Sequence, residues 1–133
     1  MFSTLLPKLI SLTSEAGETI MTLHNDNMSF IVKSDKTPLT QADKISHNLI
    51  TKTLKKITPG VPILSEESKK IPFSVRRNWD AYWLIDPLDG TRDFLDGTSN
   101  FCINIAYVVN NYPIFGMIYA PFDKIHYYRL PEQ

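Results

Sequence analysis

Two aspartates stand at the end of an apolar stretch in the segment WLIDPLDGTRDFL. Asp86 and Asp89 are separated by a proline and a leucine, and Gly90 and Thr91 follow directly. An Asp-Gly pair between apolar segments is, by itself, an ordinary hairpin signal. Pro87 disfavours helix at the preceding residue and has no N–H to offer a carboxylate, so both acids are expected in an extended loop at a strand end. Two like charges held there need a counter-charge.

A divalent cation is the counter-charge that this motif favours. Carboxylates and a backbone carbonyl, such as that of Leu88, are hard oxygen ligands suited to Mg²⁺. Gly90 and Thr91 are expected to open a short helix, where free N–H groups attract phosphate and glycine lets the backbone approach closely. The motif therefore predicts that a metal ion and a phosphate group meet at one point.

Further acidic residues stand at two other element boundaries. Glu66 and Glu67 follow the apolar run VPIL and Ser65, and alone they are best explained as the solvated start of a helix that Ser65 caps. Beside a second acidic strand end, however, Glu66 becomes a candidate third ligand. Asp43, in TPLTQAD, stands where an acid in the first turn of a helix is expected, which is its better explanation in isolation.

Other catalytic patterns are not found in the sequence. The histidines His24, His47 and His126 lack metal-ligand spacing such as HExxH, and each is interpreted as surface or partly buried. The sequence contains no G-x-S-x-G elbow and no Walker loop, so nothing indicates a covalent serine mechanism. The single cysteine, Cys102, lies in the apolar run FCINIAYVV and is interpreted as a small buried hydrophobe.

The spacing of apolar residues predicts two helices that precede most of the strands. Spacings of three and four predict an amphipathic helix from Leu5 to Leu23. A second apolar stripe predicts a helix that begins at Thr40 or Gln41 and ends at Ile57, before Pro-Gly. Between them, MSFIVKSD predicts a strand or hairpin arm that leads into a loop.

The rest of the chain predicts strands. Val61–Leu64 and Asp80–Ile85 are short apolar runs, and each delivers carboxylates at its end. The segments FCINIAYVV, YPIFGMIYAP and KIHYYRL are separated by turn residues and predict an antiparallel meander. We therefore expect an α/β layered (α+β) fold with helices packed on a largely antiparallel sheet.

Composition and charge restrict the class of protein. A chain of 133 residues with 43% hydrophobic residues is expected to form one globular core. Basic and acidic residues balance at 14 each, so no overall field attracts nucleic acid or an anionic membrane. No apolar run reaches the ~18 residues of a membrane span. We expect a cytoplasmic protein, with peripheral attachment to a membrane left open.

Three segments together resemble a known signature. In order and spacing, KSDKTPLTQAD, LSEES and WLIDPLDGT are similar to the motifs of the inositol monophosphatase superfamily, the lithium-sensitive metal-dependent phosphomonoesterases. Within it, the whole chain, including TPGVPILSEE and FGMIYAP, looks most like the N-terminal half of the bacterial CysQ-type 3'(2'),5'-bisphosphate nucleotidases. The resemblance implies the N-terminal part of the inositol monophosphatase / sugar phosphatase fold. It also implies Mg²⁺-dependent hydrolysis of adenosine 3',5'-bisphosphate to AMP and phosphate by a metal-activated water.

The resemblance assigns metal-binding roles by motif. Glu66 would bind the first metal and Asp86 would bridge metals. The Leu88 carbonyl would complete the first site, and Asp89 would bind the second metal. The family uses two or three Mg²⁺ ions, and we expect fewer here because the family's later Trp-Asp motif, with its ligand aspartate, is not found before Gln133.

Catalytic and substrate contacts are implied in the same way. Thr91, linked to Asp43, would align the attacking water and help to deprotonate it, and Glu66 is the third catalytic candidate. The residues expected to contact the substrate are Glu66, Leu88, Asp89, Gly90 and Thr91. Gly90 and Thr91 would contribute their backbone amides.

The length of the chain leaves alternatives open. Residues 1–133 are expected to form the N-terminal α/β part of the phosphatase, with the C-terminal half absent and activity impaired. One alternative is an inactive remnant or a metal- and phosphate-binding interaction module. The other is an enzyme that acts on an inositol or sugar phosphate. The expected partners are a small phosphorylated substrate and either a second copy of the chain or a complementing C-terminal half. No nucleic-acid partner is expected.

Overall fold

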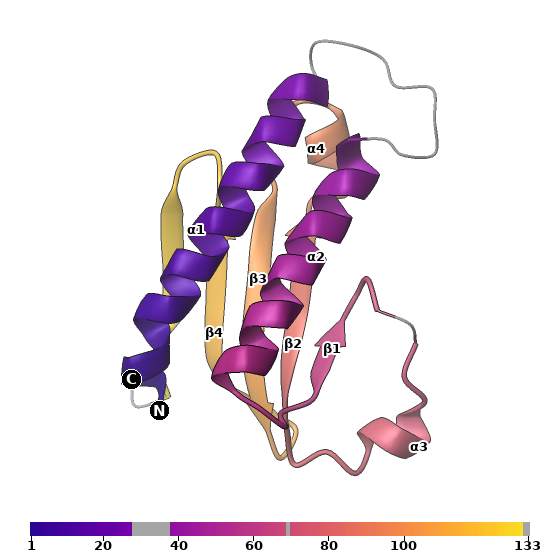
Figure 1. The fold of residues 1–133 in the computed structure, drawn as a ribbon, viewed down its shortest axis with the longest axis vertical. Helices are drawn as coiled ribbons and strands as arrows, with labels where there is room; N and C mark the ends of the chain where they lie inside the picture. The colour runs from indigo at the N-terminus through magenta and orange to yellow at the C-terminus, as the bar shows by residue number, and fades with distance from the viewer. Residues whose placement is uncertain (28–37, 69, 132–133) are drawn as a thin grey trace.

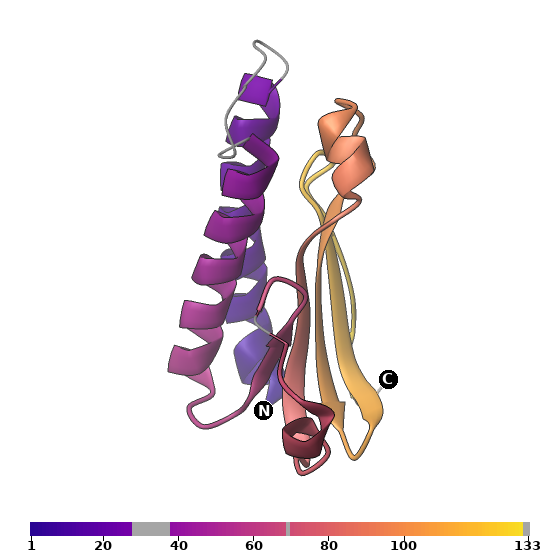
Figure 2. The same ribbon diagram turned by 90° about the vertical axis from the view of Figure 1, so that its right-hand side faces the viewer.

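The computed structural model describes residues 1–27, 38–68 and 70–131, and within them the chain forms two layers. Helices α1 (Phe2–Asn27) and α2 (Pro38–Ile57) lie side by side over one face of a five-stranded sheet (Figures 1 and 2). The predicted fold of helices packed on a largely antiparallel sheet is confirmed. The strand predicted for MSFIVKSD lies outside the described residues.

The sheet combines one parallel pair with an antiparallel meander. β1 runs parallel to β2, and every later neighbour in the order β1-β2-β3-β4-β5 is antiparallel. The meander predicted from the apolar segments is confirmed, and Asn110 and Asn111 form its first turn with φ of 48° and 69°. The strands are β1 (Ile63–Ser65), β2 (Ala81–Asp89), β3 (Cys102–Val109), β4 (Tyr112–Ala120) and β5 (Ile125–Arg129).

Several predicted boundaries were wrong for local reasons. α2 begins at Pro38 rather than at Thr40 or Gln41, because proline is well suited to the first position of a helix. β2 does not end at Ile85 but continues to Asp89, with a register irregularity between Asp86 and Asp89. The two aspartates therefore lie in the last part of a strand and not in a loop.

Two short helices complete the described chain, and one of them was not predicted. α3 (Phe73–Arg76) is a single exposed turn in the connection from β1 to β2. α4 (Thr91–Leu95) follows the aspartate motif and is the turn or two of helix expected there.

The core lies between the helices and the sheet. Trp83 of β2 is completely buried and donates its Nε1–H to Thr58 Oγ1 at 2.9 Å. Its ring lies edge-on to Tyr107, with 4.8 Å between the ring centroids. Leu88 of the aspartate motif is 1% exposed, so the backbone that carries both aspartates is anchored in this core.

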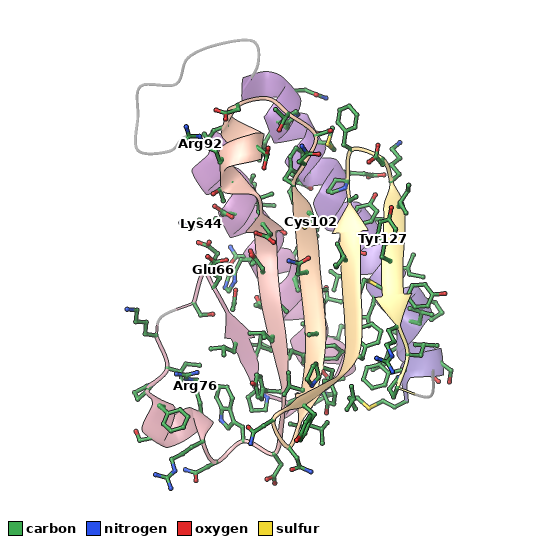
Figure 3. All side chains as sticks on the ribbon, turned by 180° about the vertical axis from the view of Figure 1, so that it is seen from behind. Lys44, Glu66, Arg76, Arg92, Cys102 and Tyr127 are labelled. Atoms are coloured by element: carbon green, nitrogen blue, oxygen red, sulfur yellow. The ribbon has the colours of Figure 1, made fainter. Side chains whose placement is uncertain are left out.

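The opposite face of the sheet is not covered by any described element (Figure 2). Cross-strand neighbours share a face, so the register places Asp86, Asn104, Ile118 and Tyr127 in one row across β2 to β5. A groove of about 850 Å³ runs over this face. Figure 3 views this surface, which we call the open face, with the helices behind the sheet.

Candidate metal and phosphate site

The parallel pairing of β1 and β2 brings two acidic residues to the same end of the sheet. Ser65, the last residue of β1, pairs with Ile85, so Glu66, which follows β1, lies beside Asp86, which is still within β2. The Glu66 amide donates to the Ile85 carbonyl at 3.3 Å. Figure 3 shows Glu66 where β1 ends, next to β2.

The arrangement disfavours the ionised form of Asp86. Its pKa is raised from 3.8 to about 7, first by burial, then by a hydrogen bond with Glu66 and by the charges of Glu66 and Asp89. The Leu88 amide opposes the shift, because it donates to Asp86 Oδ1 at 3.2 Å. Near neutral pH, the folded chain thus keeps a carboxylate whose ionised form needs positive charge.

Asp43 adds a further carboxyl group from α2. Burial raises its pKa to about 7, and the charges of Glu67 and Glu66 contribute to the shift. Its Oδ1 atom is buried without a hydrogen-bond partner among the described residues. The prediction that Asp43 is an acid in the first turn of its helix was wrong, because α2 already begins at Pro38 and has no acidic residue in its first turn. Asp43 instead lies in the second turn, where the charges of Glu66 and Glu67 act on it.

Asp89 and Gly90 have a different geometry. The Gly90 amide donates to Asp89 Oδ1 at 2.9 Å, and Asn104 Nδ2 donates to Asp89 Oδ2 at 3.0 Å. Gly90 has a φ of 85°, and a Cβ there would lie 2.6 Å from the Asn100 carbonyl oxygen, so glycine is required. Thr91, exposed, then begins α4.

The four carboxylates are not arranged as a ready-made metal centre. Among residues 1–27, 38–68 and 70–131, no group of three or more His, Cys, Asp or Glu side chains is placed to hold an ion. Ionised carboxylates repel one another, and Asp89 is held by Asn104 and Gly90 rather than by the Glu66–Asp86 pair. The assignment of Glu66, Asp86, Leu88 and Asp89 as ligands remains a prediction.

Three polar residues around these acids were not identified from the sequence. Ser46 Oγ donates to the Pro87 carbonyl at 2.8 Å, and His47 Nδ1 lies 2.9 Å from Ser65 Oγ. Asn104 is the third. For two of them the sequence does carry a signal, a polar residue inside an apolar pattern. Ser46 interrupts the buried stripe of α2, and Asn104 interrupts FCINIAYVV. Cys102, expected to be buried, is half-buried, with Sγ 3.4 Å from Asn104 Oδ1.

Comparison with known proteins shows the family to which the chain belongs. The model of the inositol monophosphatase family matches residues 3–130. The chain belongs to the inositol monophosphatase family. It is 43% identical over 127 residues to the 3'(2'),5'-bisphosphate nucleotidase CysQ of Buchnera aphidicola subsp. Acyrthosiphon pisum (strain APS), covering 92% of this chain and 47% of that protein.

Solved structures of the inositol monophosphatase family have the same fold. CysQ from Bacteroides thetaiotaomicron superimposes with a TM-score of 0.80 at 39% identity, over 90% of this chain and 43% of that one. Inositol monophosphatase-II from Staphylococcus aureus MSSA476 superimposes with a TM-score of 0.76 at 26% identity, over 96% of this chain and 45% of that one. The chain thus spans about half the length of the relatives it matches. None of the described helices has the length and apolar character needed to cross a bilayer.

The raised pKa of Asp43 predicts a pH-dependent effect on stability. The folded pKa, about 7, exceeds the ordinary value of 3.8, so between these values the folded chain binds more protons than the unfolded chain. This stabilisation is complete below 3.8 and is lost as the pH rises through about 7. We expect Asp43→Asn to become more stable relative to wild type as the pH rises from about 5 to about 8.

Urea unfolding in EDTA at several pH values measures this difference. The comparison with the variant is needed because the lowered pKa of His47 and of His126 acts on stability in the opposite direction. A stability difference between wild type and Asp43→Asn that stays constant across the range would contradict the prediction.

Proposed function

We propose that this chain is part of a Mg²⁺-dependent phosphomonoesterase that hydrolyses adenosine 3',5'-bisphosphate to AMP and phosphate. The observation that carries the proposal is the adjacent pair Glu66 and Asp86, with the pKa of Asp86 raised to about 7, in a chain 43% identical to a CysQ nucleotidase. A carboxylate with that pKa at a strand end favours a cation.

The donor set is suited to Mg²⁺. The side chains of Glu66, Asp86 and Asp89 and the Leu88 carbonyl are all hard oxygen donors. The charges of Glu66 and Asp89 both raise the pKa of Asp86, so a cation bound at Asp86 would offset both charges. When bound, Mg²⁺ polarises phosphate oxygens, lowers the pKa of water and stabilises the leaving oxygen. We propose fewer ions here than in the full-length relatives.

The remaining residues of the motif would bind phosphate and move a proton. Gly90 and Thr91 would offer backbone amides to the phosphate, with the Gly90 amide turning from Asp89 to the substrate. Thr91 Oγ1 would orient the attacking water. Asp43, whose pKa of about 7 suits proton transfer near neutral pH, would accept the proton with Thr91.

We further propose that the open face contacts the polypeptide that corresponds to the other half of the relatives. The chain covers 47% of the Buchnera relative, and the groove on the open face begins at the site, because Glu66 and Asp86 line one end of it. Leu84, Ile118 and Tyr127 are 42%, 48% and 58% exposed on this face. Contiguous apolar surface of this kind usually marks an interface.

A phosphate-release assay tests the proposed activity. The chain, alone and together with the unmatched half of the Buchnera CysQ relative, is given adenosine 3',5'-bisphosphate or inositol monophosphate, with Mg²⁺ or with EDTA. We expect Mg²⁺-dependent release from the nucleotide that exceeds release from inositol monophosphate. The reverse preference would favour the inositol phosphatase alternative, and Mg²⁺ binding with no release in either arrangement would favour an interaction module.

A further inference from the structure

Two consecutive residues of α2 each hydrogen-bond to one of the two strand ends that carry the proposed ligands. Ser46 Oγ donates to the Pro87 carbonyl of β2 at 2.8 Å, and His47 Nδ1 lies 2.9 Å from Ser65 Oγ of β1. Ser46 is completely buried and Ser65 is 5% exposed, so water competes poorly for either bond. One turn of α2 thus links both strand ends at the level of the site.

The link from Ser46 continues to Asp86 through a single peptide unit. Pro87 has no N–H, so its carbonyl is the group by which this residue can be held. That carbonyl and the Leu88 N–H belong to the same planar trans peptide and point in opposite directions. The Leu88 N–H donates to Asp86 Oδ1 at 3.2 Å. Holding the carbonyl against Ser46 therefore aims the amide at Asp86.

The link from His47 holds the backbone on both sides of Glu66. Ser65 precedes Glu66, and its Oγ accepts a hydrogen bond from the Glu67 amide at 3.3 Å. The Glu66 amide itself donates to the Ile85 carbonyl at 3.3 Å. His47 fixes the hydroxyl on which this turn is built, so it acts on Glu66 through Ser65.

We propose that Ser46 and His47 are positioning residues that set the separation between Glu66 and Asp86. When both are ionised, these two carboxylates repel each other, whereas a metal site needs them to stay close together. The two hydrogen bonds from one rigid helix resist that separation. The inference rests on the proposed function, because it assumes that Glu66 and Asp86 bind the cation.

Mn²⁺ binding to the full chain, measured by electron paramagnetic resonance, tests the proposal. Ser46→Ala and His47→Ala should each weaken binding by about 10-fold or more, the range found for outer-shell partners of metal ligands. His47→Asn should restore affinity, because its amide reaches the place of Nδ1. Thr51→Val is the matched control, because Thr51 Oγ1 donates to the His47 carbonyl at 2.8 Å and to the Asn48 carbonyl at 3.3 Å, both within α2.

A second measurement needs no metal. Hydrogen exchange of the Leu88 amide should be faster in Ser46→Ala than in Thr51→Val by on the order of 10-fold, since the amide loses its fixed direction toward Asp86. Urea unfolding of each variant shows whether the fold is kept. If Ser46→Ala does not fold, His47→Ala and His47→Asn, at a partly exposed side chain, decide the question.

The outcomes separate this inference from the proposed function. Wild-type Mn²⁺ affinity in both alanine variants overturns the inference, and so does an equal loss in Thr51→Val. If the wild-type chain binds no Mn²⁺, the proposed cation site within this chain fails, and Leu88 exchange alone decides the link through Ser46. Unchanged exchange overturns that link, and faster exchange in Ser46→Ala supports it.

Discussion

Replacing Asp86 by asparagine is expected to weaken Mg²⁺ or Mn²⁺ binding by at least about 100-fold, the upper end of what even outer-shell changes cost. The substitution keeps the size of the side chain but removes a carboxylate whose pKa is raised by the charges of both Glu66 and Asp89. In EDTA at about pH 8, the same variant should be at least as stable as wild type, because a folded-state pKa of about 7 means that ionised Asp86 destabilises the fold. Affinity and stability should thus change in opposite directions.

Titration calorimetry with Mg²⁺ and urea unfolding in EDTA measure the two effects. Asp96→Asn is the matched control at the same end of the molecule. Its carboxylate forms an exposed pair with Arg92 at 3.4 Å, and pairs of this kind contribute little. If Asp86→Asn bound Mg²⁺ as wild type does, Asp86 would not be a ligand. If the variant lost affinity and also unfolded more easily in EDTA, the residue would be structural.

The features that follow from local spacing could be predicted from the sequence. The stripes of α1 and α2 and the alternation in the meander are set by which residues must face the core, so they were found to within a few residues. The aspartate motif was found for the same reason: Leu88 is apolar and anchors the backbone, whereas Asp86 and Asp89 interrupt the apolar run on either side of a proline. Local chemistry of this kind can be recognised in the amino-acid sequence.

The features that depend on tertiary contacts could not be predicted. Nothing in VPILS or DAYWLID states that the two strands pair in parallel, yet that pairing places Glu66 beside Asp86. His24 was interpreted as surface or partly buried, and it is 2% exposed, with its ring centroid 5.3 Å from that of Phe94 and 4.9 Å from that of Phe101. Aromatic partners that come from distant segments make such burial possible, and spacing along the chain does not show them.

The second large effect expected concerns the chain in isolation, which should self-associate and release phosphate at close to background rates. The open face carries Leu84, Ile118 and Tyr127, each more than 40% exposed. β5 is the last strand of the sheet in the order observed, so its outer edge is unpaired by any described strand. Apolar faces and free strand edges promote association with whatever polypeptide is present, which in a pure solution is a second copy.

The half of the Buchnera relative that this chain does not match is the proposed partner for that face. When this half is co-purified with the chain, the two should form a one-to-one complex. A stable interface buries roughly 1,200–2,000 Å² of accessible surface in total, and the open face, which extends across the sheet, is the surface that would supply this chain's share. Light scattering measures the mass of each species. Ile118→Asp should weaken the complex, whereas Ile45→Asp, on α2 at the covered side and with a similar exposed fraction of 43%, should not.

Catalysis should follow assembly, because the described acids alone leave the charge at the site incomplete. Asp86 is a half-buried carboxylate with a pKa of about 7, and both oxygens of Asp89 already accept hydrogen bonds, from the Gly90 amide and from Asn104 Nδ2. A second cation is therefore expected to bind weakly until further ligands arrive. With the partner half present, turnover of adenosine 3',5'-bisphosphate should rise from background toward an ordinary enzymatic rate, on the order of 1–10 per second. A monodisperse monomer that reached that rate alone would contradict both halves of this prediction. It would mean that the groups needed to stabilise the leaving oxygen are all contained in residues 1–133.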